Sequence, residues 1–260
     1  MYKTDYHIHT IYSDGQSDFH AYIDKAVETG FSEIGFSEHL AIDNEFSAVS
    51  IDLNRINNYI DELINIREKR SDIKIRIGFE VDYDLNAEEK ISKITRSLPL
   101  DYVIGSVHFL EKGGLDMTPD FYKDKDINLL WEEYFMLVEK AAESGLFDII
   151  GHIDLIRIFG YYPQTDISHY YKSMAKKLKA HNLAFEINTN GFNKHVNDFY
   201  PDRKFLHHFY REGIPVCVNS DAHKPERVGQ FFDVAYSVLR ETGYKQMVTF
   251  EKRNRRSKSF

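Results

Sequence analysis

Short apolar runs alternate with longer amphipathic stretches about seven times along this chain of 260 residues. The apolar runs predict strands at residues 4–9, 33–37, 74–81, 102–107, 149–153, 184–188 and 215–220. The amphipathic stretches predict helices at 18–29, 53–70, 129–144, 170–180, 203–211 and 225–241. Such alternation is typical of parallel strands joined by right-handed helical crossovers, so the predicted class is α/β.

The length is usual for a single α/β barrel. No Pro/Gly/Ser-rich linker, repeat or low-complexity segment interrupts the chain, so residues 1–245 are predicted to form one domain. Residues 246–260 contain a run of basic side chains, which predicts a solvated C-terminal tail rather than a phosphate-binding arm. These side chains are Lys252, Arg253, Arg255, Arg256 and Lys258.

The charge balance limits the partners of this chain. With 33 basic and 41 acidic residues, the net charge is -8. Non-specific binding to nucleic acid or to an anionic membrane needs clustered positive charge, so neither partner is expected. A small molecule is the predicted partner, and the sequence does not indicate an oligomeric state.

The single cysteine, Cys217, lies in the apolar run IPVCV and is interpreted as a small buried hydrophobe. A chain that cannot form an intramolecular disulfide suits a reducing compartment. No apolar run approaches the length that crosses a membrane, and the N-terminus lacks the apolar core of a signal peptide. We therefore expect a cytoplasmic protein.

Residues of the metal-ligand type recur where the predicted strands end. The first strand carries His7 and His9, which point to the same face because residues two apart in a strand do so. The other predicted strand ends supply His39, Glu80, His108, His152, Asp221 and His223. In a closed barrel all these ends converge on one face, where such enzymes build their active sites.

Each of these residues also has an ordinary structural explanation. A single histidine could be a hydrogen-bonded loop residue, Glu80 could pair with Arg76, and Asp221 could cap the helix that follows. Chance would have to supply a ligand-type residue independently at six strand ends, however. The collective pattern therefore favours a metal site.

With Asp14, the candidate ligands number nine: His7, His9, Asp14, His39, Glu80, His108, His152, Asp221 and His223. A catalytic zinc needs about three protein ligands, so nine suit two or three divalent ions. Imidazoles and carboxylates without a thiolate suit zinc, manganese or iron. Paired metals activate water and neutralise phosphoryl oxygens, which favours phosphate-ester hydrolysis, although amide hydrolysis would use a similar ligand set.

The motifs HxH, SDG, SEH, GFEVDY, GSVHF, GHID and SDAHKP resemble those of the polymerase-and-histidinol-phosphatase (PHP) superfamily. The sequences GFEVDY, DYVIGSVHF and GHIDLIRIFG are most similar to the histidinol-phosphate phosphatases. The resemblance implies a distorted (β/α)7 TIM-like barrel with a trinuclear metal site. It also implies hydrolysis of L-histidinol phosphate to L-histidinol and phosphate, a step of histidine biosynthesis.

The resemblance further implies how the ligands divide among the metals. His7, His9, Glu80 and Asp221 would hold one ion, and Glu80 would bridge to a second ion held by His108 and His152. Asp14, His39 and His223 would hold the third. The Asp14 position is a histidine in some members, so the third site is expected to be weaker or to prefer a harder ion.

Catalytic roles are predicted for Glu80 as the bridging ligand and for Arg157 as a phosphate clamp, since a guanidinium can grip two oxygens. The alternative for Arg157 is a salt bridge at the barrel rim. The leaving oxygen needs a proton, which Asp14, His223 or a metal-bound water could supply.

Four residues near the sixth strand are candidates for contact with substrate. Asn188 and Asn190 could hydrogen-bond substrate or shape a turn with Gly191. Glu186 could receive the substrate amine or serve as internal support. His195 could approach the substrate from the following loop or lie on the surface.

Two alternative functions stay open at this point. A PHP phosphoesterase could act on another phosphomonoester, such as phosphotyrosine, a nucleotide or a sugar phosphate. A non-catalytic metal-binding module is the alternative from another class, and full metal content without turnover of p-nitrophenyl phosphate would indicate it.

Overall fold

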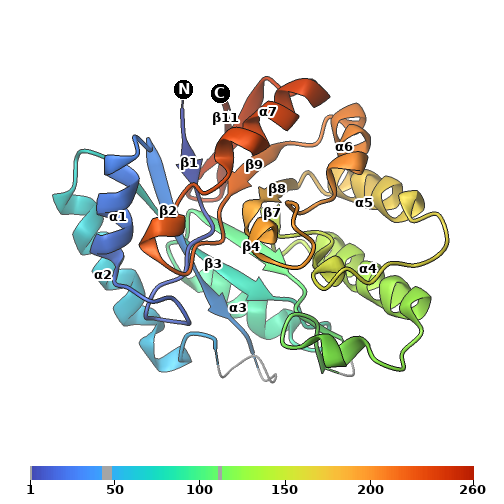
Figure 1. Ribbon diagram of the computed structural model, residues 1–260. Helices are drawn as coiled ribbons and strands as arrows, with labels where there is room; N and C mark the ends of the chain where they lie inside the picture. The colour runs from blue at the N-terminus through green and yellow to red at the C-terminus, as the bar shows by residue number, and fades with distance from the viewer. Residues whose placement is uncertain (1, 43–48, 111–112) are drawn as a thin grey trace.

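Seven parallel strands form the central sheet of the computed structural model, which describes residues 2–42, 49–110 and 113–260 (Figure 1). Their order is β1-β2-β3-β4-β7-β8-β9, so each strand pairs with the next one along the chain. The strands are β1 (Thr4–Asp5), β2 (Glu33–Leu40), β3 (Lys74–Asp82), β4 (Tyr102–Ser106), β7 (Ile149–Ile150), β8 (Ala184–Asn188) and β9 (Val216–Asn219). All seven predicted strands are present, and the predicted α/β barrel is confirmed.

The barrel closes imperfectly between β1 and β9. The backbone N–H of His9 donates to the Ala222 carbonyl at 3.0 Å, and the Ala222 N–H donates to the His7 carbonyl at 3.1 Å. Below these bonds, the Tyr6 N–H donates to the side chain of Asn219 at 2.9 Å instead of to a strand backbone. This seam is the distortion of the (β/α)7 barrel, and it explains why the regular part of the first strand ends at Asp5.

Helices surround the sheet on the outside (Figure 1). They are α1 (Phe19–Glu28), α2 (Ile56–Lys69), α3 (Glu88–Ser97), α4 (Ile127–Glu143), α5 (Ser168–Ala180), α6 (Leu206–Glu212) and α7 (Phe232–Thr242). The sequence predicted six of them and missed α3, which buries only Ile91 and Thr95. The last helix starts later than predicted, because Pro225–Arg227 forms a separate 3-10 turn and Phe231 adopts a left-handed conformation.

The Tyr102 side chain lies inside the barrel and packs across β2 and β3, over one glycine of each strand. A Cβ at Gly35 or Gly78 would lie 2.6 or 2.5 Å from atoms of the Tyr102 ring or hydroxyl, so neither position accepts a larger residue. The Tyr102 hydroxyl donates to the carbonyl oxygens of Tyr6 at 2.6 Å and Phe36 at 3.0 Å. Its polar end is therefore satisfied inside the core.

The C-terminal segment differs from the predicted solvated tail. It forms an antiparallel hairpin of β10 (Gln246–Glu251) and β11 (Asn254–Ser259). Val248 and Phe250 are buried in one cluster with Tyr6 and Tyr102, inside the barrel. At the hairpin turn, Arg253 N–H donates to the Asp101 carbonyl at 2.9 Å. The free energy gained by burying the apolar side chains of β10 against the core outweighs the preference of the basic side chains of β11 for water.

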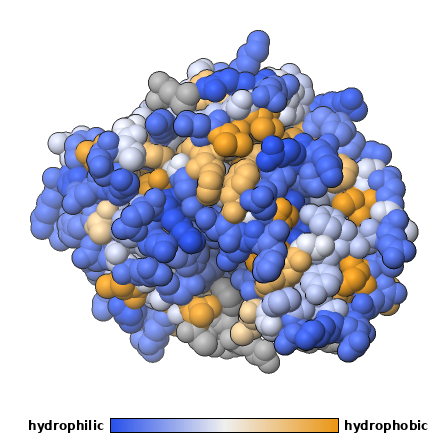
Figure 2. Space-filling view, in the orientation of Figure 1, coloured by the Kyte–Doolittle hydropathy of each residue, from blue (hydrophilic) through white to orange (hydrophobic). Residues whose placement is uncertain are grey.

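The face seen in Figure 2 is mainly hydrophilic, with hydrophobic residues in small groups. Within the described ranges, no helix has both the length and the apolar character needed to cross a bilayer. A short hairpin of β5 (Phe109–Leu110) and β6 (Gly113–Gly114) follows β4. The sequence has two long loops, residues 41–51 after β2 and residues 111–126 after β4, and β6 lies in the second. Residues 43–48 and 111–112 of these loops lie outside the described residues.

Candidate metal centre

The parallel register brings the candidate ligands together at the C-terminal ends of the strands. His39 on β2 is the register partner of Glu80 on β3. His108 follows β4, His152 follows β7, and Asp221 and His223 follow β9. The β1 segment supplies His7 and His9 beside Ala222. All nine predicted ligands lie within this cluster, as the convergence of barrel strand ends requires.

Glu80 lies at the centre of the cluster and is fully buried. Its two oxygens face different histidines. Oε2 lies 2.8 Å from His39 Nδ1, 3.1 Å from His7 Nε2 and 3.4 Å from His9 Nε2. Oε1 lies 2.9 Å from His152 Nε2 and 3.6 Å from His108 Nε2. A carboxylate shared in this way can bridge two ions.

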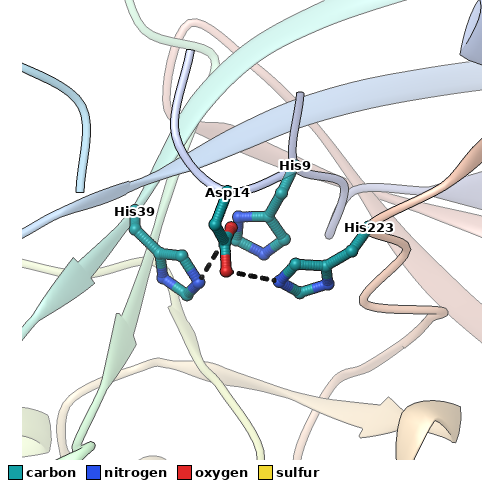
Figure 3. Close-up of side chains that lie close together, drawn as sticks. All are labelled: His9, Asp14, His39 and His223. Atoms are coloured by element: carbon teal, nitrogen blue, oxygen red, sulfur yellow. Dashed lines mark ion pairs between the residues drawn. The ribbon is translucent and has the colours of Figure 1, made fainter. Parts of the chain in front are cut away.

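A second group of ligands within the cluster consists of His9, Asp14, His39 and His223 (Figure 3). The Asp14 carboxylate lies between two imidazoles, 3.6 Å from His39 Nε2 and 3.2 Å from His223 Nε2. The His9 ring stacks on both, with centroid distances of 4.1 and 4.4 Å. His9 therefore belongs geometrically to this group as well as to the group of His7 and Asp221.

Metal ions would satisfy polar atoms that the described residues leave without hydrogen bonds. These atoms are His7 Nε2, both ring nitrogens of His9 and Glu80 Oε2, all buried. Burying a carboxylate or an imidazole acceptor without a partner is costly, so the cluster fits cations held between these atoms. The donor set of imidazoles and carboxylates fits zinc, manganese or iron.

The protonation of the cluster follows from its burial and its charges. Burial and the neighbouring imidazoles of His39 and His223 lower the pKa of His9 to about 3, so its ring is neutral and able to bind a cation. For His108, burial is opposed by the carboxylates of Glu80 and Asp82, which raise its pKa to about 9. Asp14 and Asp221 raise the pKa of His223 to about 9 against the effect of burial.

Carboxylates behind the ligands hold the imidazoles in place. Glu186 Oε2 lies 3.0 Å from His7 Nδ1, and Asp82 Oδ1 lies 3.3 Å from His108 Nδ1. Glu186 is fully buried and also accepts from the His152 N–H at 2.8 Å and from Asn219 Nδ2 at 2.7 Å. Of its two sequence interpretations, these contacts match internal support. Outer-shell partners of this kind fix the orientation of ligating histidines.

A cavity of about 340 Å³ opens onto the cluster. Seven of the nine candidate ligands line it, with Asp14 and His223 among them. The other lining residues are Val49, Phe109, Asp116, Met117, Leu155, Ile158, Asn190, Lys194, Tyr200 and Arg227. Both long loops thus contribute to the wall, through Val49 from one and Asp116 from the other.

Arg157 does not line this cavity. It is 1% exposed, its Nε lies 2.8 Å from Asp154 Oδ2, and a terminal nitrogen donates to the Phe199 carbonyl. Its guanidinium also lies over the ring of Tyr200, 5.1 Å from the centroid. These contacts match the salt-bridge alternative, and a phosphate clamp at Arg157 stays a prediction.

The predicted substrate contacts around β8 differ in position. Asn188 is fully buried, and its Nδ2 donates to Glu186 and Asp221 at 3.0 and 3.2 Å. Asn190 lines the cavity, and its Nδ2 also donates to Asp221 at 3.2 Å. His195 is exposed outside the lining, 5.7 Å from the Phe159 ring. Contact of any of them with substrate stays a prediction.

Sequence reasoning missed three charged residues of the cavity wall: Asp116, Lys194 and Arg227. Each lies in a loop or at a short turn, where no periodicity indicates direction. Only their position in the sequence could have indicated two of them. Lys194 precedes the candidate His195, and Arg227 follows the SDAHKP motif.

With this geometry in place, comparison with known proteins decides the family. Residues 5–190 match the PHP domain family. A probable histidinol-phosphatase from Deinococcus radiodurans is 32% identical over 255 residues, which cover 96% of each chain. This chain belongs to the histidinol-phosphatase family of PHP-domain proteins. The family assignment made from the motifs is confirmed.

Other members of the family agree over nearly the full length. The histidinol-phosphatase of Lactococcus lactis is 28% identical, covering 96% of this chain and 95% of its own. A crystal structure of the Lactococcus lactis enzyme complexed with zinc, L-histidinol and phosphate matches with a TM-score of 0.84, at 25% identity and over 98% of both chains. Metal-dependent tyrosine phosphatases from Bacillus subtilis and Streptococcus pneumoniae share the fold, with a TM-score of 0.56 and 18% identity.

Proposed function

We propose that this chain hydrolyses L-histidinol phosphate to L-histidinol and phosphate, and so acts in histidine biosynthesis. The observation that carries this proposal is the buried Glu80 carboxylate, whose oxygens face five imidazoles beneath an open cavity. The named activity of the relatives, and the zinc, L-histidinol and phosphate bound by the Lactococcus lactis enzyme, support the same reaction.

We further propose that the cluster holds three divalent ions, with zinc, manganese and iron as the candidates. His7, His9, Glu80 and Asp221 would hold the first ion, Glu80, His108 and His152 the second, and Asp14, His39 and His223 the third. When bound, such ions supply an activated water and neutralise the charge that builds on phosphoryl oxygens. A cytoplasmic location stays a prediction from cysteine usage.

The cavity wall supplies charges of both signs that suit the two ends of this substrate. Lys194 and Arg227 are cations on the wall, and we assign them to the phosphoryl oxygens. Asp116 is a carboxylate on the same wall, and its Oδ1 is buried without a hydrogen bond to the described residues. We assign Asp116 to the ammonium group of the substrate. Asp14 and His223, predicted as proton donors to the leaving oxygen, also line the wall.

The test is phosphate release by the purified chain reconstituted with manganese or zinc. L-histidinol phosphate is compared with phosphotyrosine, a nucleoside monophosphate, a sugar phosphate and p-nitrophenyl phosphate. We expect kcat/KM to be highest for L-histidinol phosphate by a wide margin. Equal or greater efficiency on another phosphomonoester would replace the substrate, and full metal content without any turnover would reject the enzymatic function.

A further inference from the structure

Glu38 is a buried carboxylate that the proposed reaction does not use. It precedes His39 on β2 and is fully buried. Among the described residues, the charged side chain that acts on it is that of the neighbouring His39, and no lysine or arginine is paired with it. A buried charge without a cationic partner is retained only where hydrogen bonds stabilise it, so its contacts indicate what it does.

The hydrogen bonds of Glu38 all come from one short segment beyond β1. The Thr10 N–H lies 3.1 and 3.0 Å from the two carboxylate oxygens, and Thr10 Oγ1 donates to Oε1 at 2.7 Å. Ser13 Oγ donates to Oε2 at 2.5 Å. One carboxylate therefore holds both ends of the turn formed by residues 10–13.

These contacts join neighbours of three candidate ligands. Thr10 follows His9, Ser13 precedes Asp14, and Glu38 itself precedes His39. The fourth ligand of this group is tied to the same segment, because the Gln16 N–H donates to the His223 carbonyl at 2.9 Å. Every member of the group shown in Figure 3 is thus connected to the turn that Glu38 holds.

The turn is tight, and on its outer side Tyr12 Oη donates to Glu62 at 2.6 Å. The N–H groups of Ser13 and Gly15 both donate to the Thr10 carbonyl, at 3.0 and 2.9 Å. A Cβ on Gly15 would lie 2.1 Å from the His9 carbonyl oxygen, so only glycine lets the chain pass there. The Asp14 side chain is 30% exposed, and it depends on this turn for its direction toward His39 and His223.

We propose that Glu38 is a positioning residue that assembles the group of His9, Asp14, His39 and His223 into a metal site. The proposal rests on the proposed metal-dependent function and deepens it. By fixing residues 10–14 against β2, Glu38 sets the distance between Asp14 and the two imidazoles before an ion binds. The group of Glu80, His108 and His152 has no residue in this turn, so it is expected to bind metal independently of Glu38.

Three substitutions remove or keep the individual hydrogen bonds. Glu38→Gln leaves one acceptor oxygen, and its amide nitrogen must face a donor from Thr10 or Ser13. Thr10→Val removes the hydroxyl with almost no change in shape, whereas Thr10→Ser keeps it. Glu33→Gln is the matched control, because Glu33 is a buried carboxylate on the same strand. It accepts from Tyr6 Oη and Arg76 Nε, both at 2.8 Å, away from the ligands.

The experiment is calorimetric titration of each metal-free protein with zinc, together with the bound metal per chain and the unfolding temperature. We expect three ions on the wild type. Glu38→Gln is expected to weaken the ion of Asp14, His39 and His223 by about 10–100-fold, the usual effect of removing an outer-shell partner, and to leave the ion of Glu80, His108 and His152 unchanged. Thr10→Val should weaken the same ion to a smaller extent, and Thr10→Ser and Glu33→Gln should bind as the wild type does.

Several results would overturn the proposal: a wild type that binds only two ions, wild-type binding by Glu38→Gln, or an equal weakening of all sites that Glu33→Gln reproduces. If Glu38→Gln does not fold, the difference between Thr10→Val and Thr10→Ser decides. Zinc binding is measured without substrate, so failure to hydrolyse L-histidinol phosphate would reject the proposed reaction without affecting this result.

Discussion

Glu80 and His39 are register partners on neighbouring parallel strands, and Glu80 Oε2 lies 2.8 Å from His39 Nδ1. The other oxygen of the same carboxylate lies 2.9 Å from His152 Nε2. One strand position therefore places a single carboxylate between two sets of imidazoles. The adjacent pairing of β2 and β3 makes this contact a property of the barrel itself.

Glu80→Gln is expected to abolish most activity, because an amide cannot supply two anionic oxygens to a pair of ions. The loss in kcat should exceed the roughly 10–100-fold expected for an outer-shell substitution. Steady-state kinetics and metal content of the purified variant check this. Near-normal turnover with full metal content would reject Glu80 as the bridging ligand.

Arg157→Ala is expected to lower the free energy of unfolding by about 3–5 kcal/mol, because it leaves the buried Asp154 carboxylate without its ion-pair partner. Denaturant unfolding measures this. Arg203→Ala is the control, since Arg203 pairs with Asp198 at the surface and its loss should cost about 0–1 kcal/mol. A raised KM for substrate in Arg157→Ala would support the phosphate-clamp prediction, whereas equal stability of the two variants would contradict the buried ion pair.

Asp116→Asn is expected to raise the KM for L-histidinol phosphate by about tenfold or more, because a charged hydrogen bond contributes roughly 1.5–3 kcal/mol. The KM for p-nitrophenyl phosphate, which has no ammonium group, should not change. Asp120→Asn is a suitable control, since Asp120 pairs with Lys123 at the surface nearby. An equal rise for both substrates would show that Asp116 does not recognise the ammonium group.

The effect of metal on stability is expected to grow with pH. The carboxylates raise the pKa of His108 and His223 to about 9 in the metal-free chain, against burial. Because these folded-state values exceed the ordinary value of about 6.5, the two protonated histidines stabilise the metal-free fold fully below pH 6.5. This contribution is lost as the pH rises to 9, while metal ions bind the neutral rings more tightly.

Unfolding temperatures with and without zinc, measured from pH 6.5 to 9, test this prediction. The difference between the two should increase across the range, and zinc binding should release protons at pH 7. A difference that is constant or shrinks would show that these histidines are not protonated in the metal-free chain.

The seven strands and the gathering of the candidate ligands at one end of the barrel could be predicted from the sequence alone. Alternating apolar runs identified all seven strands, and each strand direction placed its last residues at one end of the barrel. The ligands could therefore be named before their distances were known. Each ligand alone is a weak signal, and the recurrence of ligand-type residues at six strand ends makes the pattern informative.

Tertiary structure decided the features that depend on which segments meet. The basic residues of the last segment predicted a solvated tail, whereas in the fold Val248 and Phe250 are buried in one cluster with Tyr6 and Tyr102. Asp116 and Lys194 lie in loops, where direction has no periodic signal.

Glu38 shows the same division most clearly. The sequence shows that Glu38 precedes His39. Its four hydrogen bonds to Thr10 and Ser13, however, exist only because β1 and β2 pair. The periodic pattern of the sequence indicated where each strand ends and therefore which residues stand there. Which buried groups satisfy one another was decided by closure of the barrel, because such pairs join residues far apart in the chain.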